Sequence, residues 1–294
     1  MRIYITSFCN EFEYPDEATL AFSDAYDQIS NNIEAFDIFQ NQVELYNNDQ
    51  LTNHGVALED MDKVAEITGV HKYTVHLLFY ICLSHHTREL YKEKNIAYDI
   101  FYDSMSDLKW KLFECKKVYD IWGSFVAWWF GRFFDLTRFA IGRLQFETYE
   151  FGRTYSKNGL TIKPNNIVLN VHIPSCGPMK HEDCLASYKK AAEFYKDVFK
   201  DRPVVFICCS WLLYPAHREF LPASSNILAF MSDYDIIESS IDEEGSFMWR
   251  IYETMDFKDM EKLPCDTSLR RAYYDWLSKG NKGGSGFGVF VYNK

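Results

Sequence analysis

The sequence predicts an α+β protein in which an all-helical domain, residues 1–139, precedes a mixed β-sheet domain with flanking helices, residues 140–294. In the first part, apolar residues recur three and four positions apart, which is the spacing of helices that bury one face. In the second part, short apolar runs typical of strands alternate with helical segments. A length of 294 residues with 47% hydrophobic residues is sufficient for two cores.

The first domain should consist of helices throughout, because strand-like alternation is scarce in it. The apolar spacing places these helices at residues 23–39, 60–68, 72–88, 97–122 and 125–139.

Residues 60–81 have the pattern of a helix–turn–helix, with Gly69 in the turn. The second helix would present His71, Lys72 and His76, yet the N-terminal 50 residues contain ten acidic residues and one basic residue, a net charge of −9. Such acidic surroundings repel phosphate. We therefore expect a helical hairpin that packs into the core, and no binding of nucleic acid.

The second domain should contain five strands and two longer helices. The strands are expected at 142–149, 167–173, 204–212, 247–252 and 288–292, and the helices at 182–199 and 268–279. The glycine-rich stretch 280–288 is expected to form a loop before the last strand.

Several features favour a cytoplasmic protein without a membrane partner. The eight cysteines are scattered, without the dense spacing of a disulfide scaffold, which indicates reduced thiols. The N-terminus lacks a basic segment followed by an apolar one, so export is not expected. The most apolar segment, 121–131, has eleven residues and is too short to span a bilayer.

The most informative stretch is 168–179, VLNVHIPSCGPM, where an apolar strand breaks into a proline- and glycine-rich turn and then a helix. The unpaired N–H groups of a helix's first turn favour phosphate or carboxylate. A right-handed crossover should bring the strand at 204–212 beside this one. Either Cys208 and Ser210 or Cys209 and Trp211 should then share a face with His172.

The residue types at these positions also suggest two other chemistries. Four potential zinc ligands lie within thirteen residues, but they follow one continuous strand, turn and helix rather than two separated ligand pairs, so no metal is expected. These ligands are His172, Cys176, His181 and Cys184. Hydrolysis by Ser210 is weakly indicated, because no G-x-S-x-G motif surrounds it.

Five ordered motifs resemble those of a bacterial acyltransferase-domain family, in which an N-terminal helical domain precedes a GNAT-like (N-acetyltransferase) C-terminal domain. The C-terminal half carries the motifs, and the helical half fits by its architecture. The motifs are IGRLQFE (141–147), VLNVHIPSCGPM (168–179), CCSWLLYP (208–215), LPASSNI (221–227) and LPCDTSLRRA (263–272).

The resemblance implies that the strands at 167–173 and 204–211 begin parallel and splay apart, admitting the pantetheine arm of an acyl-CoA. The pyrophosphate would meet the N-terminus of the helix that starts near His181. The chain departs from the usual Q/R-x-x-G-x-G/A loop, and Pro178 lacks an N–H, so at least one phosphate donor is missing. The cofactor-binding residues implied are Ile173, Ser175, Cys176, Gly177, Met179, Lys180 and His181.

The resemblance also implies an N-acyltransferase that moves an acyl group from acetyl-CoA, or another acyl-CoA, to an unidentified small-molecule amine by direct attack. The candidate bases are His172, which titrates near neutrality, and Glu147. Ser210 and Tyr214 are alternative donors to the leaving thiolate, and the sequence does not choose between them.

The alternative is a catalytically inactive GNAT-fold protein with a binding or regulatory role. Pro178 favours it, and so does Cys209, because the resembling family usually has His there. The sequence leaves the acceptor and the oligomeric state open.

Overall fold

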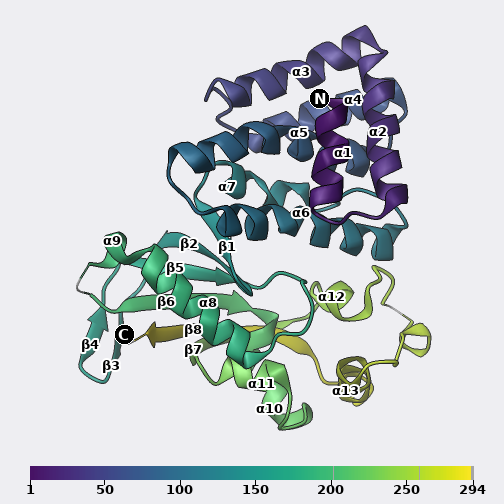
Figure 1. The fold of residues 1–294 in the computed structure, drawn as a ribbon. Helices are drawn as coiled ribbons and strands as arrows, with labels where there is room; N and C mark the ends of the chain where they lie inside the picture. The colour runs from purple at the N-terminus through teal and green to yellow at the C-terminus, as the bar shows by residue number, and fades with distance from the viewer. Residues whose placement is uncertain (201, 258, 293–294) are drawn as a thin grey trace. The chain divides into compact units, whose positions relative to one another are not determined.

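The computed structural model describes residues 1–200, 202–257 and 259–292, and the chain divides into two compact units, Met1–Phe139 and Ala140–Lys294 (Figure 1). The first unit is helical and the second is built on a mixed sheet with flanking helices, which confirms the predicted fold class.

The first unit is organised around α5, Lys72–Glu93. Residues 77–83 of this helix are all buried, because it contacts α1, α2, α3, α4 and α6. A helix with a buried stretch on every side is the centre of a core rather than a surface helix. The other helical elements are α1 (Arg2–Glu11), α2 (Asp16–Ser30), α3 (Ile33–Asn47), α4 (His54–Thr68), α6 (Tyr98–Tyr119), the 3-10 helix η1 (Ala127–Trp129) and α7 (Gly131–Phe134).

Two predictions for this unit are wrong. The helix expected at 23–39 is two helices, because the Asn32 side chain caps α3 by accepting a hydrogen bond from the Ala35 N–H at 3.1 Å. The helix expected at 125–139 is replaced by η1, α7 and the start of a strand. There the aromatic side chains Phe130 and Phe133 are buried by short turns instead of by one helix face.

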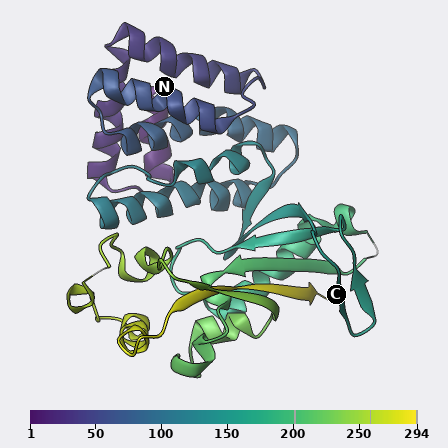
Figure 2. The ribbon, with the colours of Figure 1, turned by 180° about the vertical axis from the view of Figure 1, so that it is seen from behind.

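The second unit contains a six-stranded sheet in the order β1-β2-β5-β6-β8-β7. The β5–β6 pair is parallel, whereas β2–β5, β6–β8 and β7–β8 are antiparallel. Figure 2 shows the last strand, β8, within the sheet rather than at its edge. The strands are β1 (Arg138–Ile141), β2 (Leu144–Glu150), β5 (Ile167–His172), β6 (Val204–Ser210), β7 (Asp235–Asp242) and β8 (Gly283–Tyr292), with a separate hairpin of β3 (Tyr155–Lys157) and β4 (Leu160–Ile162).

One face of the sheet is covered by α8, His181–Phe194. The ring of Tyr188 on this helix lies 6.3 Å from that of Phe146, 4.9 Å from Phe206 and 5.0 Å from Phe290. The remaining helical elements are α9 (Lys196–Phe199), η2 (Trp211–Leu213), α10 (His217–Phe220), α11 (Asn226–Met231), α12 (Met248–Tyr252), η3 (Met260–Lys262) and α13 (Ser268–Leu277).

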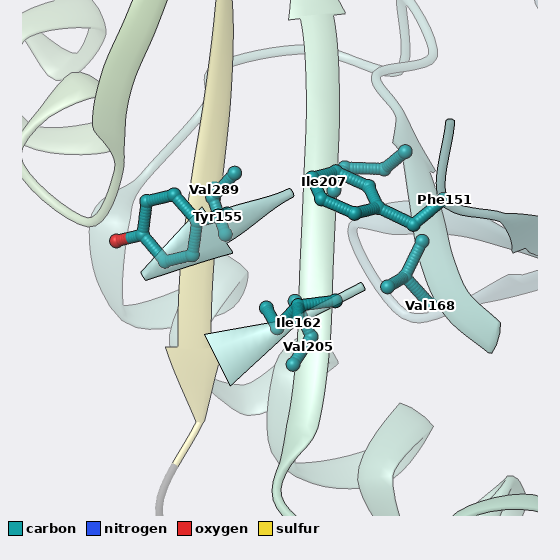
Figure 3. Close-up of a cluster of buried hydrophobic side chains, with 7 residues drawn as sticks. All are labelled: Phe151, Tyr155, Ile162, Val168, Val205, Ile207 and Val289. Atoms are coloured by element: carbon teal, nitrogen blue, oxygen red, sulfur yellow. The ribbon is translucent and has the colours of Figure 1, made fainter. Parts of the chain in front are cut away.

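The opposite face carries a second apolar cluster, drawn in Figure 3. Tyr155 and Ile162 of the β3–β4 hairpin pack there with Val205 and Ile207 of β6. Side chains alternate along a strand, so β6 directs Phe206 to α8 and its neighbours to the hairpin.

Further elements differ from the sequence-based expectation, which also lacked β1 and the hairpin β3–β4. The strand expected at 247–252 is helix α12, Met248–Tyr252, which packs Met248, Ile251 and Tyr252 against Tyr273. Strand β7 was not expected because its residues are mostly polar and exposed, as suits an edge strand.

The stretch expected as a loop, 280–288, is largely strand β8. A side chain would not fit at several of its glycines: a Cβ on Gly286 would lie 2.2 Å from the Leu213 carbonyl oxygen. Glycine serves close packing here rather than flexibility.

Candidate functional site

The parallel strands β5 and β6 are joined over a short distance only. The paired residues are Leu169 with Phe206 and Asn170 with Ile207. Strand β6 nevertheless stays paired with β8 as far as Ser210. The ladder between the two parallel strands therefore ends before either strand does.

A polar cluster lies where this ladder ends, on the face opposite α8. The His172 Nε2 lies 2.9 Å from the Glu147 Oε1, and the Asn170 Nδ2 donates to the same oxygen at 3.2 Å. The alternation explains the placement: Phe146 points to α8, so Glu147 points away, and the register sets Glu147 opposite Asn170. The strand that the sequence pattern identified thus brings both candidate bases together.

The burial of this cluster determines its chemistry. The side chain of Glu147 is 4% exposed and that of His172 is 19% exposed. A carboxylate only accepts hydrogen bonds, so at 2.9 Å the His172 Nε2 carries a proton when Glu147 is ionised. The carboxylate then fixes the orientation of the imidazole and stabilises its protonated form, which suits a general base.

Cys209, rather than Cys208, shares this face. It is exposed and two residues beyond Ile207, the partner of Asn170. Partial desolvation by neighbouring residues, together with the nearby Glu238, raises the pKa of the Cys209 thiol. The other thiol, Cys208, is fully buried on the α8 side of the sheet.

The two candidate thiolate donors lie at and after the end of β6. The Ser210 Oγ accepts a hydrogen bond from the Leu212 N–H at 3.2 Å and so caps η2. The hydroxyl hydrogen of Ser210 is not used by that bond. Tyr214 packs its ring against Gly284 of β8 and lies edge-on to His217, with 5.9 Å between ring centroids. Both stay candidates.

The loop between β5 and α8 contains most of the implied cofactor-binding residues. Gly177 has a φ of +103°, in the region that favours glycine. Of the implied residues, Ser175, Gly177 and Lys180 are exposed, Ile173, Cys176 and His181 are half-buried, and Met179 is buried.

Arg143, which the sequence reasoning missed, binds this loop. Its guanidinium donates to the carbonyl oxygens of Pro174 at 3.0 Å, Gly177 at 2.9 Å and Pro178 at 3.3 Å. Arg143 stands at the turn between β1 and β2, within the motif IGRLQFE. That motif was the only sequence signal that could have drawn attention to it.

The first turn of α8 includes a second, half-buried pair. Lys180 occupies the N-cap without a side-chain cap, and the His181 Nε2 lies 2.8 Å from the Asp233 Oδ1. Burial raises the pKa of the Asp233 carboxyl, and the hydrogen bond from His181 opposes this shift. Among the described residues, the Asp233 Oδ2 has no hydrogen-bond partner.

The four His and Cys residues weighed as zinc ligands do not converge. His172 is bonded to Glu147 and His181 to Asp233. In the part of the chain that the structure describes, no three His, Cys, Asp or Glu side chains are grouped to hold a metal ion. All eight cysteines are free thiols. No helix among the described residues has the length and apolar content needed to cross a bilayer.

Comparison with known families gives two matches that together cover almost the whole chain. Residues 138–290 match the GNAT-like C-terminal domain, and residues 4–136 match the N-acyltransferase N-terminal domain. No curated protein matches the chain.

Solved structures with a similar fold include an acyltransferase in complex with decanoyl-CoA and teicoplanin, at 18% identity and a TM-score of 0.75. A mutant acyltransferase in complex with octanoyl-CoA is similar at 17% identity and a TM-score of 0.76. Both alignments cover 98% of this chain and 87% of the other. At such identities the likeness establishes the fold.

Proposed function

Since the chain belongs to the family that joins an N-acyltransferase N-terminal domain to a GNAT-like C-terminal domain, we propose that it moves an acyl group from acyl-CoA to an amine. The observation that carries the proposal is the buried Glu147–His172 pair at the point where β5 and β6 part. A base at that position could serve a thioester held between the two strands.

The proposed donor site extends from the parted strands to the loop. The pantetheine arm would lie between β5 and β6, and the pyrophosphate would lie against residues 175–181 at the start of α8. Exposed loop residues and a helix N-terminus suit an anion there. The solved relatives bind octanoyl- and decanoyl-CoA, so the acyl group of this chain's donor ranges from the acetyl group expected from sequence to these longer chains.

In the proposed reaction, the amine nitrogen attacks the thioester carbonyl carbon, the C–S bond breaks, and CoA leaves as its thiolate. His172 takes the proton from the amine, while the Glu147 carboxylate stabilises the imidazolium. A main-chain N–H near the end of β5 would polarise the thioester oxygen. Ser210 or Tyr214 would protonate the thiolate.

The acceptor is proposed to be a small molecule with a free amine. One solved relative holds teicoplanin beside decanoyl-CoA, which supports a small-molecule acceptor. A cytoplasmic location is also proposed, and the eight free thiols agree with it.

A second candidate function is binding without catalysis. Pro178 cannot donate a backbone N–H to a phosphate, which weakens the cradle by one hydrogen bond. If the protein binds acyl-CoA but releases no free CoA when amines are added, it has this second function.

A thermal-shift series with CoA and with acetyl-, octanoyl- and decanoyl-CoA tests the proposal. At one hundred times its Kd, a ligand stabilises the folded state by about 2.7 kcal/mol, enough to raise the Tm visibly. Gly177→Glu places a carboxylate beside the pyrophosphate and should abolish the shift. Gly177→Ala introduces the same backbone strain without the charge, so this variant should keep most of the ligand-induced rise in Tm.

No shift with any of these ligands would overturn the proposal. An equal shift in wild type and Gly177→Glu would place the ligand elsewhere in the protein.

A further inference from the structure

One side chain from a different part of the sheet holds three carbonyl groups of the β5–α8 loop. Arg143 donates its Nη1 to Pro174, its Nη2 to Gly177 and its Nε to Pro178. The planar guanidinium presents these donors in a fixed geometry, so the three carbonyl groups must lie close together and face one point.

These carbonyl directions determine where the loop's N–H groups point. The described residues have no cis peptide bond, and in a trans peptide the N–H points opposite to the preceding carbonyl. The carbonyls of Pro174 and Pro178 face Arg143, so the N–H groups of Ser175 and Met179 point away from it. The carbonyl of Gly177 also faces Arg143, but the next residue is Pro178, which has no N–H to point the other way.

Arg143 is itself held firmly. The Ser187 Oγ of α8 accepts hydrogen bonds from the N–H groups of Arg143 at 2.7 Å and Leu144 at 3.3 Å. The β1–β2 turn is thereby fixed to the same helix whose first turn follows the loop. Among the described residues no carboxylate pairs with Arg143, so its positive charge is also uncompensated.

We propose that Arg143 is a positioning residue that shapes loop 174–178 for the pyrophosphate of CoA. This inference rests on the proposed function. By turning the carbonyls to one side, Arg143 keeps their oxygens away from the side of the loop on which the phosphate oxygens would lie, which offsets the donor missing at Pro178.

The test compares CoA binding by isothermal titration calorimetry in wild type, Arg143→Lys, Arg143→Gln and a control. Lysine keeps the charge but cannot hold three carbonyls in one plane. Both Arg143 variants should raise the Kd of CoA by at least about tenfold, the size of one lost charge-assisted hydrogen bond. Arg202→Gln is the control. Arg202 also donates to two carbonyl oxygens, those of Val198 and Phe199, but these belong to α9 and not to loop 174–178. Its Kd should stay within about twofold of wild type.

A kinetic measurement separates positioning from a general loss of structure. With octanoyl-CoA and a primary alkylamine, the Arg143 variants should raise the KM for octanoyl-CoA and leave kcat nearly unchanged, because they do not touch Glu147 or His172. A wild-type Kd in Arg143→Lys would show that charge alone matters, and a wild-type Kd in Arg143→Gln would show no role; either overturns the inference. If the wild-type protein does not bind CoA, the proposed function itself is wrong. That result differs from a wild-type Kd in either Arg143 variant.

Discussion

Glu147 and His172 form the pair of side chains on which the proposed chemistry depends. Sequence reasoning selected each of them separately, one from an early strand and one from a strand end. The antiparallel register of β2 and β5 places them on one face, where the carboxylate of Glu147 is buried. Arg143 could not be found in this way, because its partners lie 31 to 35 residues away and belong to a loop whose shape the sequence does not reveal.

Replacing Glu147 by Gln should lower kcat by about 10²- to 10⁴-fold, the usual contribution of general base catalysis. The amide cannot stabilise the imidazolium, while the shape of the strand is preserved. The KM for acyl-CoA should change little. Glu150→Gln, the same substitution at the exposed end of β2, should keep wild-type kcat. Steady-state rates of thiol release measure both, and full activity in Glu147→Gln would remove the pair from the mechanism.

The buried His217 should make stability depend on pH. It lies against Tyr273, with its Nε2 bonded to the tyrosine hydroxyl, and burial lowers the pKa of His217 to about 4. Since an unfolded histidine takes up a proton near pH 6.5, the unfolded state binds more protons between pH 6.5 and 4. Stability should therefore fall as the pH drops through this window, by up to about 3 kcal/mol from this group.

Chemical unfolding at several pH values measures this slope. His217→Gln removes the titrating group, so its stability should vary less with pH between 6.5 and 4 than that of wild type. His85→Gln, which removes an exposed imidazole, should keep the wild-type slope. Equal slopes in wild type and His217→Gln would contradict the assignment.

At the scale of elements, the sequence identified segments whose periodicity decides their structure and failed where packing decides it. Helices α4, α5, α6 and α8 and strands β2, β5 and β6 lie where apolar spacing predicted them, with shifted ends. Residues 247–252 are too few for periodicity to separate helix from strand. The glycine-rich start of β8 lacks side chains that signal a strand. Its pairing with β7 and its close contact with η2 explain why it forms one.

Gly286→Ala should destabilise the second unit. Its Cβ would lie 2.2 Å from the Leu213 carbonyl oxygen, so β8 or η2 must shift, at a cost of about 1–3 kcal/mol. The midpoint of denaturant unfolding should fall accordingly. Gly152→Ala is the control, because nothing lies within 4 Å of its Cβ. Equal midpoints for the two variants would show that β8 is not tightly packed at this glycine.

At the scale of the whole molecule, the fold class followed from a change of periodicity near residue 139, where the structure also divides. That change is a property of the whole sequence and does not depend on the bounds of any single element, so it was predictable. The acceptor was not, because acceptor specificity depends on loops and side chains that the fold class leaves open.

The net charge of −11 disfavours binding to the phosphate backbone of nucleic acid, and the absence of such binding stays a prediction. The hairpin α4–α5 places residues 74–84 mostly in the core, which leaves few of them for a DNA groove. Fluorescence anisotropy with a labelled duplex at low salt should show no binding. Tight binding that weakens steeply with added salt would contradict this.

The central claim is acyl transfer at the Glu147–His172 pair, and mass spectrometry of the products tests it most directly. Wild type, incubated with acetyl-, octanoyl- or decanoyl-CoA and a panel of primary amines, should form an amide with release of one CoA per amide. His172→Asn keeps a polar side chain of similar size but no base, and should form amide about 10²- to 10⁴-fold more slowly. The account is contradicted if wild type binds CoA yet forms no amide with any amine, or if His172→Asn forms amide at the wild-type rate.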